Sequence, residues 1–284
     1  MSEAVDLLRR MVMARAGDAA PWVEERLEAL AAGAPERDLH VVLGMAPRRL
    51  GKADLTPSEA ERAAAEAARP GWRIDDWSVD GALRVLAILV HGAQRPFADR
   101  FEDLRRTADA AEAIALYRGL PLYPEPEALH FEAGEALRSN LKPVFEAVAH
   151  RNPFPREQFD EHRWNHMVLK ALFVGSRLHP IQGLDERANA ELARILREYS
   201  QERRAAGRPV TPELWRCVGP FAEGDALADL ERALDHDDAP GAALALAASP
   251  DPEAERLLAP RPEAAEIEAG RLTWDSLSKT LEAA

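Results

Sequence analysis

The apolar residues of this 284-residue chain recur with the spacing of one face of an α-helix. Three segments follow the i, i+3, i+4, i+7 pattern, and no alternating strand pattern competes with them. Their apolar positions are Leu83, Leu86, Ala87 and Val90; Leu141, Val144, Phe145 and Val148; and Leu192, Ile195, Leu196 and Tyr199. Only 6% of the residues are aromatic, and β-branched runs are scarce. The sequence therefore predicts an all-α fold.

Local signals predict where helices begin and end. The stretch from Thr56 to Glu59 predicts a capping box with Pro57 at the first helical position. Asp185 is predicted to cap a long helix that Gly207 ends. Glycines and prolines leave segments of about 10 to 20 residues between them, which is a usual helix length. We expect successive antiparallel helical hairpins, arranged as an α-solenoid or as an irregular multi-helix bundle.

The chain is expected to form one continuous body with three parts. These are an N-terminal helical region (1–114), a central part (115–221), and an acidic C-terminal helical hairpin and tail (222–284). Residues 51–71 read as a linker. Helical stretches at 226–234 and 239–248 predict the hairpin, and the residues after Gly270 are expected to be loosely attached.

Charge is unevenly distributed, and this restricts the partners. The net charge is -13; residues 221–270 hold 13 acidic and 3 basic residues, whereas residues 130–220 hold 12 acidic and 14 basic residues. An acidic surface repels nucleic acid and anionic lipid, so we expect neither as a partner. The slightly positive central part could still attract a small anion.

The sequence also predicts a cytoplasmic protein. The single cysteine, Cys217, permits no intrachain disulfide. The first 16 residues lack the uninterrupted apolar core of a signal peptide because Glu3 and Asp6 interrupt it. The longest apolar run, from Leu83 to Val90, contains Arg84 and is too short to span a bilayer, so no integral membrane segment is expected.

Polar residues are threaded through the apolar runs between Leu120 and Phe221. The polar groups stand in the strings RSN from Arg138, WNHMVLK from Trp164, GLDERAN from Gly183 and ELWRC from Glu213. Burying such groups costs free energy unless each finds a partner. The pattern therefore predicts either a polar network or a ligand site.

Two long segments of this region resemble the EboA family of bacterial proteins. They are PLYPEPEALHFEAGEALRSNLKPVFEAVAHRNPFP from Pro121 and WNHMVLKALFVGSRLHPIQGLDERANAELARILREYSQERRAAGRPVTPELWRCVGPF from Trp164, and the resemblance covers about residues 115–221. It implies a place in a bacterial gene cluster that makes or moves specialised metabolites toward the periplasm. The implied partners are a pathway intermediate and the enzymes of the same cluster, among them a UbiA-type prenyltransferase. The resemblance carries no catalytic residue onto this chain.

Several residues are candidates for binding a ligand. Arg138 could hold a carboxylate or phosphate at a helix start, where Asn140 is a natural N-cap. Asn165 and Asn189 could either fix helix packing or present amides to a hydroxyl-rich ligand. Asp185 and Arg187 could pair with each other, as could Glu135 and Arg138. Lys170 and Arg216 complete the candidate set.

His179 is the best candidate for a general base, because it lies in a loop and imidazole titrates near neutral pH. Glu135 is the alternative base. Cys217, beside Arg216, is either an activated thiol or, as we expect, a buried inert one. His162 and His166 have the spacing of two metal ligands on a helix, but their setting indicates a solvated face, and the family usually has glutamine at position 166. No metal and no cofactor are predicted.

These observations lead to one main hypothesis and two alternatives. The main hypothesis is an accessory protein of a specialised-metabolite pathway that binds a small polar or anionic intermediate, or a partner enzyme, through residues 120–221. The first alternative is a cofactor-free enzyme acting on a cyclitol-type or prenyl-type intermediate. The second is a pure protein-interaction scaffold.

Overall fold

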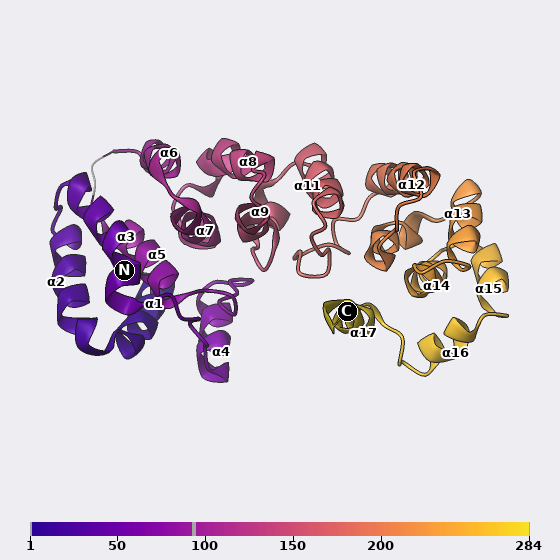
Figure 1. Cartoon of the computed structure of the whole chain (residues 1–284), viewed down its shortest axis with the longest axis horizontal. Coiled ribbons are helices and arrows are strands. Elements are labelled where there is room, and N and C mark those ends of the chain that lie inside the picture. The colour runs from indigo at the N-terminus through magenta and orange to yellow at the C-terminus, as the bar shows by residue number, and fades with distance from the viewer. Residues whose placement is uncertain (1, 93–94, 284) are drawn as a thin grey trace. The chain divides into compact units, whose positions relative to one another are not determined.

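The structure is a computed structural model that describes residues 2–92 and 95–283. The described residues contain helices and no β-strand; one isolated bridge joins Asp54 and Ser78. The all-α prediction is therefore confirmed, while the solenoid arrangement stays a prediction. Contacts divide the chain into two compact units, unit 1 from Met1 to Phe159 and unit 2 from Asp160 to Ala284 (Figure 1). The predicted three-part division is not tested by this split.

Unit 1 is built around one helix, α5 (Val79–Val90), that is buried along most of its length. Its elements are α1 (Glu3–Arg15), η1 (Gly17–Ala19), α2 (Ala20–Ala31), α3 (Glu36–Leu50), α4 (Glu59–Ala68), α5 (Val79–Val90), α6 (Phe97–Thr107), α7 (Ala110–Arg118), η2 (Leu120–Leu122), η3 (Pro126–Leu129), α8 (His130–Arg138), α9 (Lys142–Ala149) and α10 (Phe154–Gln158). Helix α5 packs against α1, α2, α3 and α7. Its two buried charges, Asp80 and Arg84, pair one turn apart at 3.1 Å, so the apolar core leaves neither charge alone.

Two boundary predictions in unit 1 were wrong. Ser58, not Thr56, caps α4 and forms a capping box with Glu61, because Thr56 has a positive φ of 43°. The stretch 51–71 is also not a linker, since α4 lies within it and Arg15 forms an ion pair with Glu61 at 2.8 Å. Helix α4 is further attached by its contacts with α1 and by the buried Ala65.

Unit 2 packs its helices around a short 3-10 segment. Its elements are α11 (Glu161–Phe173), α12 (Ala190–Ala205), η4 (Pro212–Cys217), η5 (Gly219–Phe221), α13 (Asp225–Ala233), α14 (Ala239–Ala247), α15 (Pro252–Leu258), α16 (Pro262–Glu268) and α17 (Trp274–Ala283). Segment η4 contacts α12, α14 and α17. The approach to α14 is close because position 241 is glycine: a Cβ there would lie 2.0 Å from the Pro212 carbonyl oxygen.

The C-terminal end of the long helix α12 was predicted correctly, but its N-terminal end was not. Gly207 follows the helix with a φ of +65°, as a C-terminal glycine does. The N-cap, however, is Asn189 rather than Asp185, since the Asn189 side chain accepts a hydrogen bond from the Leu192 N–H at 2.8 Å. The predicted hairpin helices are present as α13 and α14. The residues after Gly270 are not loosely attached, because α17 buries Leu277 and Ser278.

The helices of the described residues, 2–92 and 95–283, are short relative to the thickness of a bilayer. None is both long enough and apolar enough to cross a membrane.

Candidate functional site

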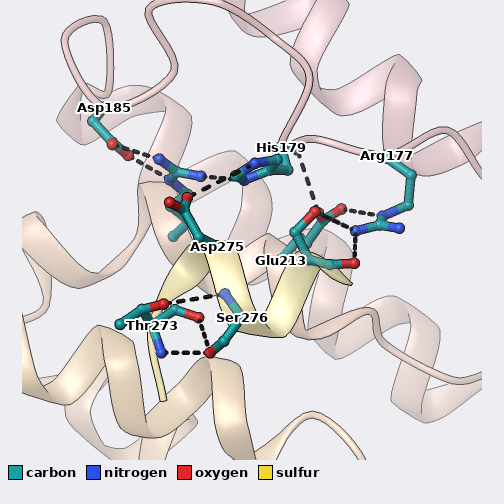
Figure 2. A network of polar contacts seen from close by, with 9 residues as sticks. Arg177, His179, Asp185, Glu213, Thr273, Asp275 and Ser276 are labelled. Carbon is teal, nitrogen blue, oxygen red and sulfur yellow. Dashed lines mark hydrogen bonds and ion pairs between the residues drawn. The ribbon is translucent and has the colours of Figure 1, made fainter. Parts of the chain in front are cut away.

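Three of the predicted residues meet in unit 2, in a group that we call the Arg216 corner: His179, Asp185 and Arg216, with Trp274 and Asp275. Figure 2 labels His179, Asp185 and Asp275 of this group. Arg216 donates to both carboxylate oxygens of Asp185 at 2.6 Å and to the Nδ1 of His179 at 3.2 Å. Its guanidinium carbon lies 5.8 Å from the centre of the Trp274 ring. The expected pairing of Asp185 with Arg187 is therefore wrong, because Asp185 faces η4 instead.

A buried carboxylate beside this corner fixes the loop that carries His179. Glu213 is 3% exposed and accepts hydrogen bonds from the Arg177 guanidinium at 2.9 and 3.1 Å. It also accepts the backbone N–H groups of Leu178 at 2.9 Å and His179 at 3.3 Å. Arg177 continues to Ser278 of α17, donating to its carbonyl and hydroxyl oxygens. Glu213 belongs to the interleaved polar strings that predict a polar network or a ligand site, but its partners could not be read from the sequence.

The start of α17 adds a further cap to the network. Thr273 and Ser276 exchange hydrogen bonds between backbone N–H and hydroxyl groups at 2.9 and 3.1 Å (Figure 2). This reciprocal cap stabilises the first turn of α17. The same turn carries Asp275, whose carboxylate lies 3.8 Å from the Nε2 of His179. Both ring nitrogens of His179 thus face charged partners. The contact of Nδ1 with Arg216 orients the imidazole, while Nε2 is only close to the exposed carboxylate of Asp275.

The two candidate asparagines bind each other. Asn165 and Asn189 exchange side-chain hydrogen bonds at 2.9 and 3.2 Å, which joins α11 to the start of α12. Arg187 stacks over the ring of Trp164, with 4.8 Å from its guanidinium carbon to the ring centre. Burial lowers the pKa of Arg187. Because each amide already has its partner, this cluster accounts for the packing of two helices.

Three further candidates, Glu135, Arg138 and Asn140, belong to unit 1. Arg138 pairs with Glu135 in unit 1, and its side chain is 71% exposed. Asn140 does not cap the next helix as predicted, because the N-cap of α9 is Leu141. The ligand role of Arg138 and Asn140 and the role of Glu135 as a general base stay predictions.

On α11, the predicted solvated stripe is present. His162 and His166 are exposed, whereas Lys170 is half-buried and burial lowers its pKa. No group of three metal-binding side chains occurs in the part of the chain that the structure describes.

Cys217 is fully buried in η4. Burial raises the pKa of its thiol to about 12, with a smaller contribution from Asp185. A thiolate is the reactive form, so the inert alternative is the one that the structure supports.

Unit 2 also contains a cleft that the sequence did not predict. Its volume is about 1050 Å³, and it is lined by Gln201, Arg204, Ala205 and residues 207–210 at the end of α12, with Arg232 and residues 235–238 between α13 and α14. Buried Asp238 fixes one wall, accepting from Arg204 and from the Trp215 Nε1, both at 2.6 Å. None of the predicted site residues lines this cleft.

The family described as "Metabolite traffic protein EboA" matches residues 4–219, and the chain belongs to that family. The match includes the N-terminal residues that the initial resemblance left out. Neither a curated protein nor a solved structure matches the chain.

Proposed function

We propose that this protein is a cytoplasmic accessory protein of a bacterial specialised-metabolite pathway that binds a small polar or anionic intermediate in the cleft of unit 2. The cleft is the observation that carries the proposal. Its volume of about 1050 Å³ is enough for a small metabolite. Its lining mixes guanidinium, carboxylate and amide groups with the apolar Pro209 and Val210, as a site for a polar molecule requires.

The chemistry nearby favours binding over catalysis. His179, the candidate base, has both ring nitrogens beside charged partners, and the Cys217 thiol is buried. Neither side chain lines the cleft. A molecule in the cleft would therefore meet groups that hold and orient it and no activated nucleophile.

A docking function is the second candidate, supported by two exposed aromatic side chains. Phe131 is 60% exposed in unit 1 and Phe173 is 77% exposed at the end of α11. Exposed aromatic residues of this kind are frequent anchors in protein interfaces. If docking is the function, Phe173→Ser will abolish co-purification with a cluster enzyme, and changes in the cleft will leave it unaltered.

Two tryptophan substitutions at the end of α12 test the cleft. Ala205 lines the cleft and Ala206 does not, while both are exposed. We expect native mass spectrometry of protein purified from cells that express the cluster enzymes to detect a small molecule, released by denaturation, on the wild type and on Ala206→Trp. Ala205→Trp should carry none. An equally loaded Ala205→Trp, or a bare wild type, would refute binding in the cleft.

A further inference from the structure

Half of the charged side chains that line the cleft are already matched by neighbours. Asp238 holds Arg204 at 2.6 Å, and Asp235 holds Arg261 at 2.7 Å. These pairs cancel locally, so they shape the cleft and contribute little net field to a ligand.

Two guanidinium groups remain after these pairs are removed. Arg208 is exposed and its side chain forms no ion pair with any described residue. Arg232 reaches Asp229 at 3.8 Å only, and that carboxylate already accepts from Arg197 at 2.8 Å and from Gln201. Only one carboxylate among the described residues of the lining, that of Asp237, is likewise unmatched. The unpaired charges of the cleft thus leave a surplus of positive charge, although residues 221–270, which supply only one side of the cleft, hold 13 acidic and 3 basic residues.

We infer that the ligand of the cleft is an anion carrying a carboxylate or phosphate group, held by Arg208 and Arg232. This inference rests on the proposed function. Guanidinium groups present paired N–H donors that match the oxygens of both anions. Arg204, held by the buried Asp238 and lying over the Trp215 ring at 5.9 Å, is the rigid wall against which the rest of the molecule packs. Gln201 and His236 add polar groups for hydroxyls.

Three related probes separate the ligand classes: myo-inositol, which is neutral; quinate, a cyclitol carboxylate; and myo-inositol 1-phosphate. Isothermal titration calorimetry on the full chain measures each affinity. We expect quinate or the phosphate to bind at least about tenfold more tightly than myo-inositol. The double variant R208Q/R232Q should lose that preference.

The matched control is R256Q/R271Q, which removes two exposed arginines of the same unit that do not line the cleft. This control changes the net charge by the same amount as R208Q/R232Q and should keep the preference for the anionic probes. The comparison therefore separates nonspecific electrostatic attraction from binding in the cleft. Quinate against the phosphate tells which anion is preferred.

The outcomes distinguish the inference from the proposed function. If all three probes bind alike and Ala205→Trp abolishes their binding, the anion inference fails and the cleft remains a binding site. If an anion binds Ala205→Trp as well as it binds the wild type, it does not enter the cleft, and both proposals fail. Undetectable binding of both anions at millimolar concentration would overturn the inference, as would an undiminished preference in R208Q/R232Q.

Discussion

The Arg216 corner and the cleft lie on two sides of η4 and differ in whether their charges are matched. In a 3-10 helix, residues three apart share a face, so Glu213 and Arg216 both point to the corner while Trp215 points to Asp238 at the cleft. In the corner each charged group has a protein partner. In the cleft, Arg208 has none among the described residues and Arg232 has only a distant one.

This difference separates a structural network from an available surface. A guanidinium that already forms two hydrogen bonds with a carboxylate gains little binding free energy from a second anion. An unpaired guanidinium has its N–H donors available for the anion. Conspicuous polar residues in a sequence therefore indicate a network as readily as a site. The following predictions test that distinction, from the largest expected effect to the smallest.

Glu213→Gln should lower the free energy of unfolding by about 3 to 5 kcal/mol, because it leaves Arg177 without its buried counter-charge. Urea unfolding followed by circular dichroism measures the loss. Glu253→Gln, which breaks an exposed pair with Arg256, is the control and should change stability by less than about 0.5 kcal/mol. Equal effects of the two changes would show that the corner is not a structural network.

Gly241→Ala should destabilise the protein by about 2 to 3 kcal/mol, since the new methyl group would overlap the Pro212 carbonyl and push η4 from α14. Thermal unfolding measures this effect. Gly44→Ala, on an exposed face of α3 with open space around it, should instead stabilise by about 0.5 to 1 kcal/mol. A neutral Gly241→Ala would mean that η4 can move, and with it the wall of the cleft.

The buried thiol of Cys217 should lower the free energy of unfolding as the pH rises above about 9. Its pKa rises from 9.0 to about 12 on folding, so above pH 9 the unfolded chain loses the thiol proton that the folded chain keeps. Between pH 8 and pH 10 this costs about 1.4 kcal/mol of stability. The measurement is the difference between wild type and Cys217→Ala in urea unfolding at both pH values. A pH dependence identical in the two proteins would contradict the closed packing around η4.

Asp185→Asn should cost less than about 1 kcal/mol, because the Asp185 side chain is 62% exposed and its pair with Arg216 is screened by solvent. Differential scanning calorimetry at low and high salt measures it, and the effect should shrink as salt rises. A loss above about 2 kcal/mol would place Asp185 with Glu213 as part of the core.

Helical spacing predicted α5, α9 and α12 well, because an apolar stripe on a helix is a local property of the chain. The caps were predicted less well. Asn189 and Asp185 are both good capping residues, and what selected Asn189 was its second bond to Asn165, 24 residues away. The start of η4 has a local signal, Thr211 followed by Pro212, but so short a 3-10 helix has no repeating pattern that would predict its type or its end.

The site was predicted in part. His179, Asp185 and Arg216 were all named, and the structure brings them together, but their contacts reveal a matched network that sequence could not foresee. The cleft was missed altogether, because its walls come from the end of α12 and from the turn before α14, about 30 residues apart. Only packing determines which exposed arginines border the same hollow.

The sequence by itself determined the helical class, the apolar faces and the membership of the EboA family, since each depends on residue type and local spacing. The tertiary structure decided which charges cancel and which remain. An ion pair depends on distances of a few ångströms between side chains that are far apart in the chain, and those distances exist only after η4, α12, α14 and α17 have packed.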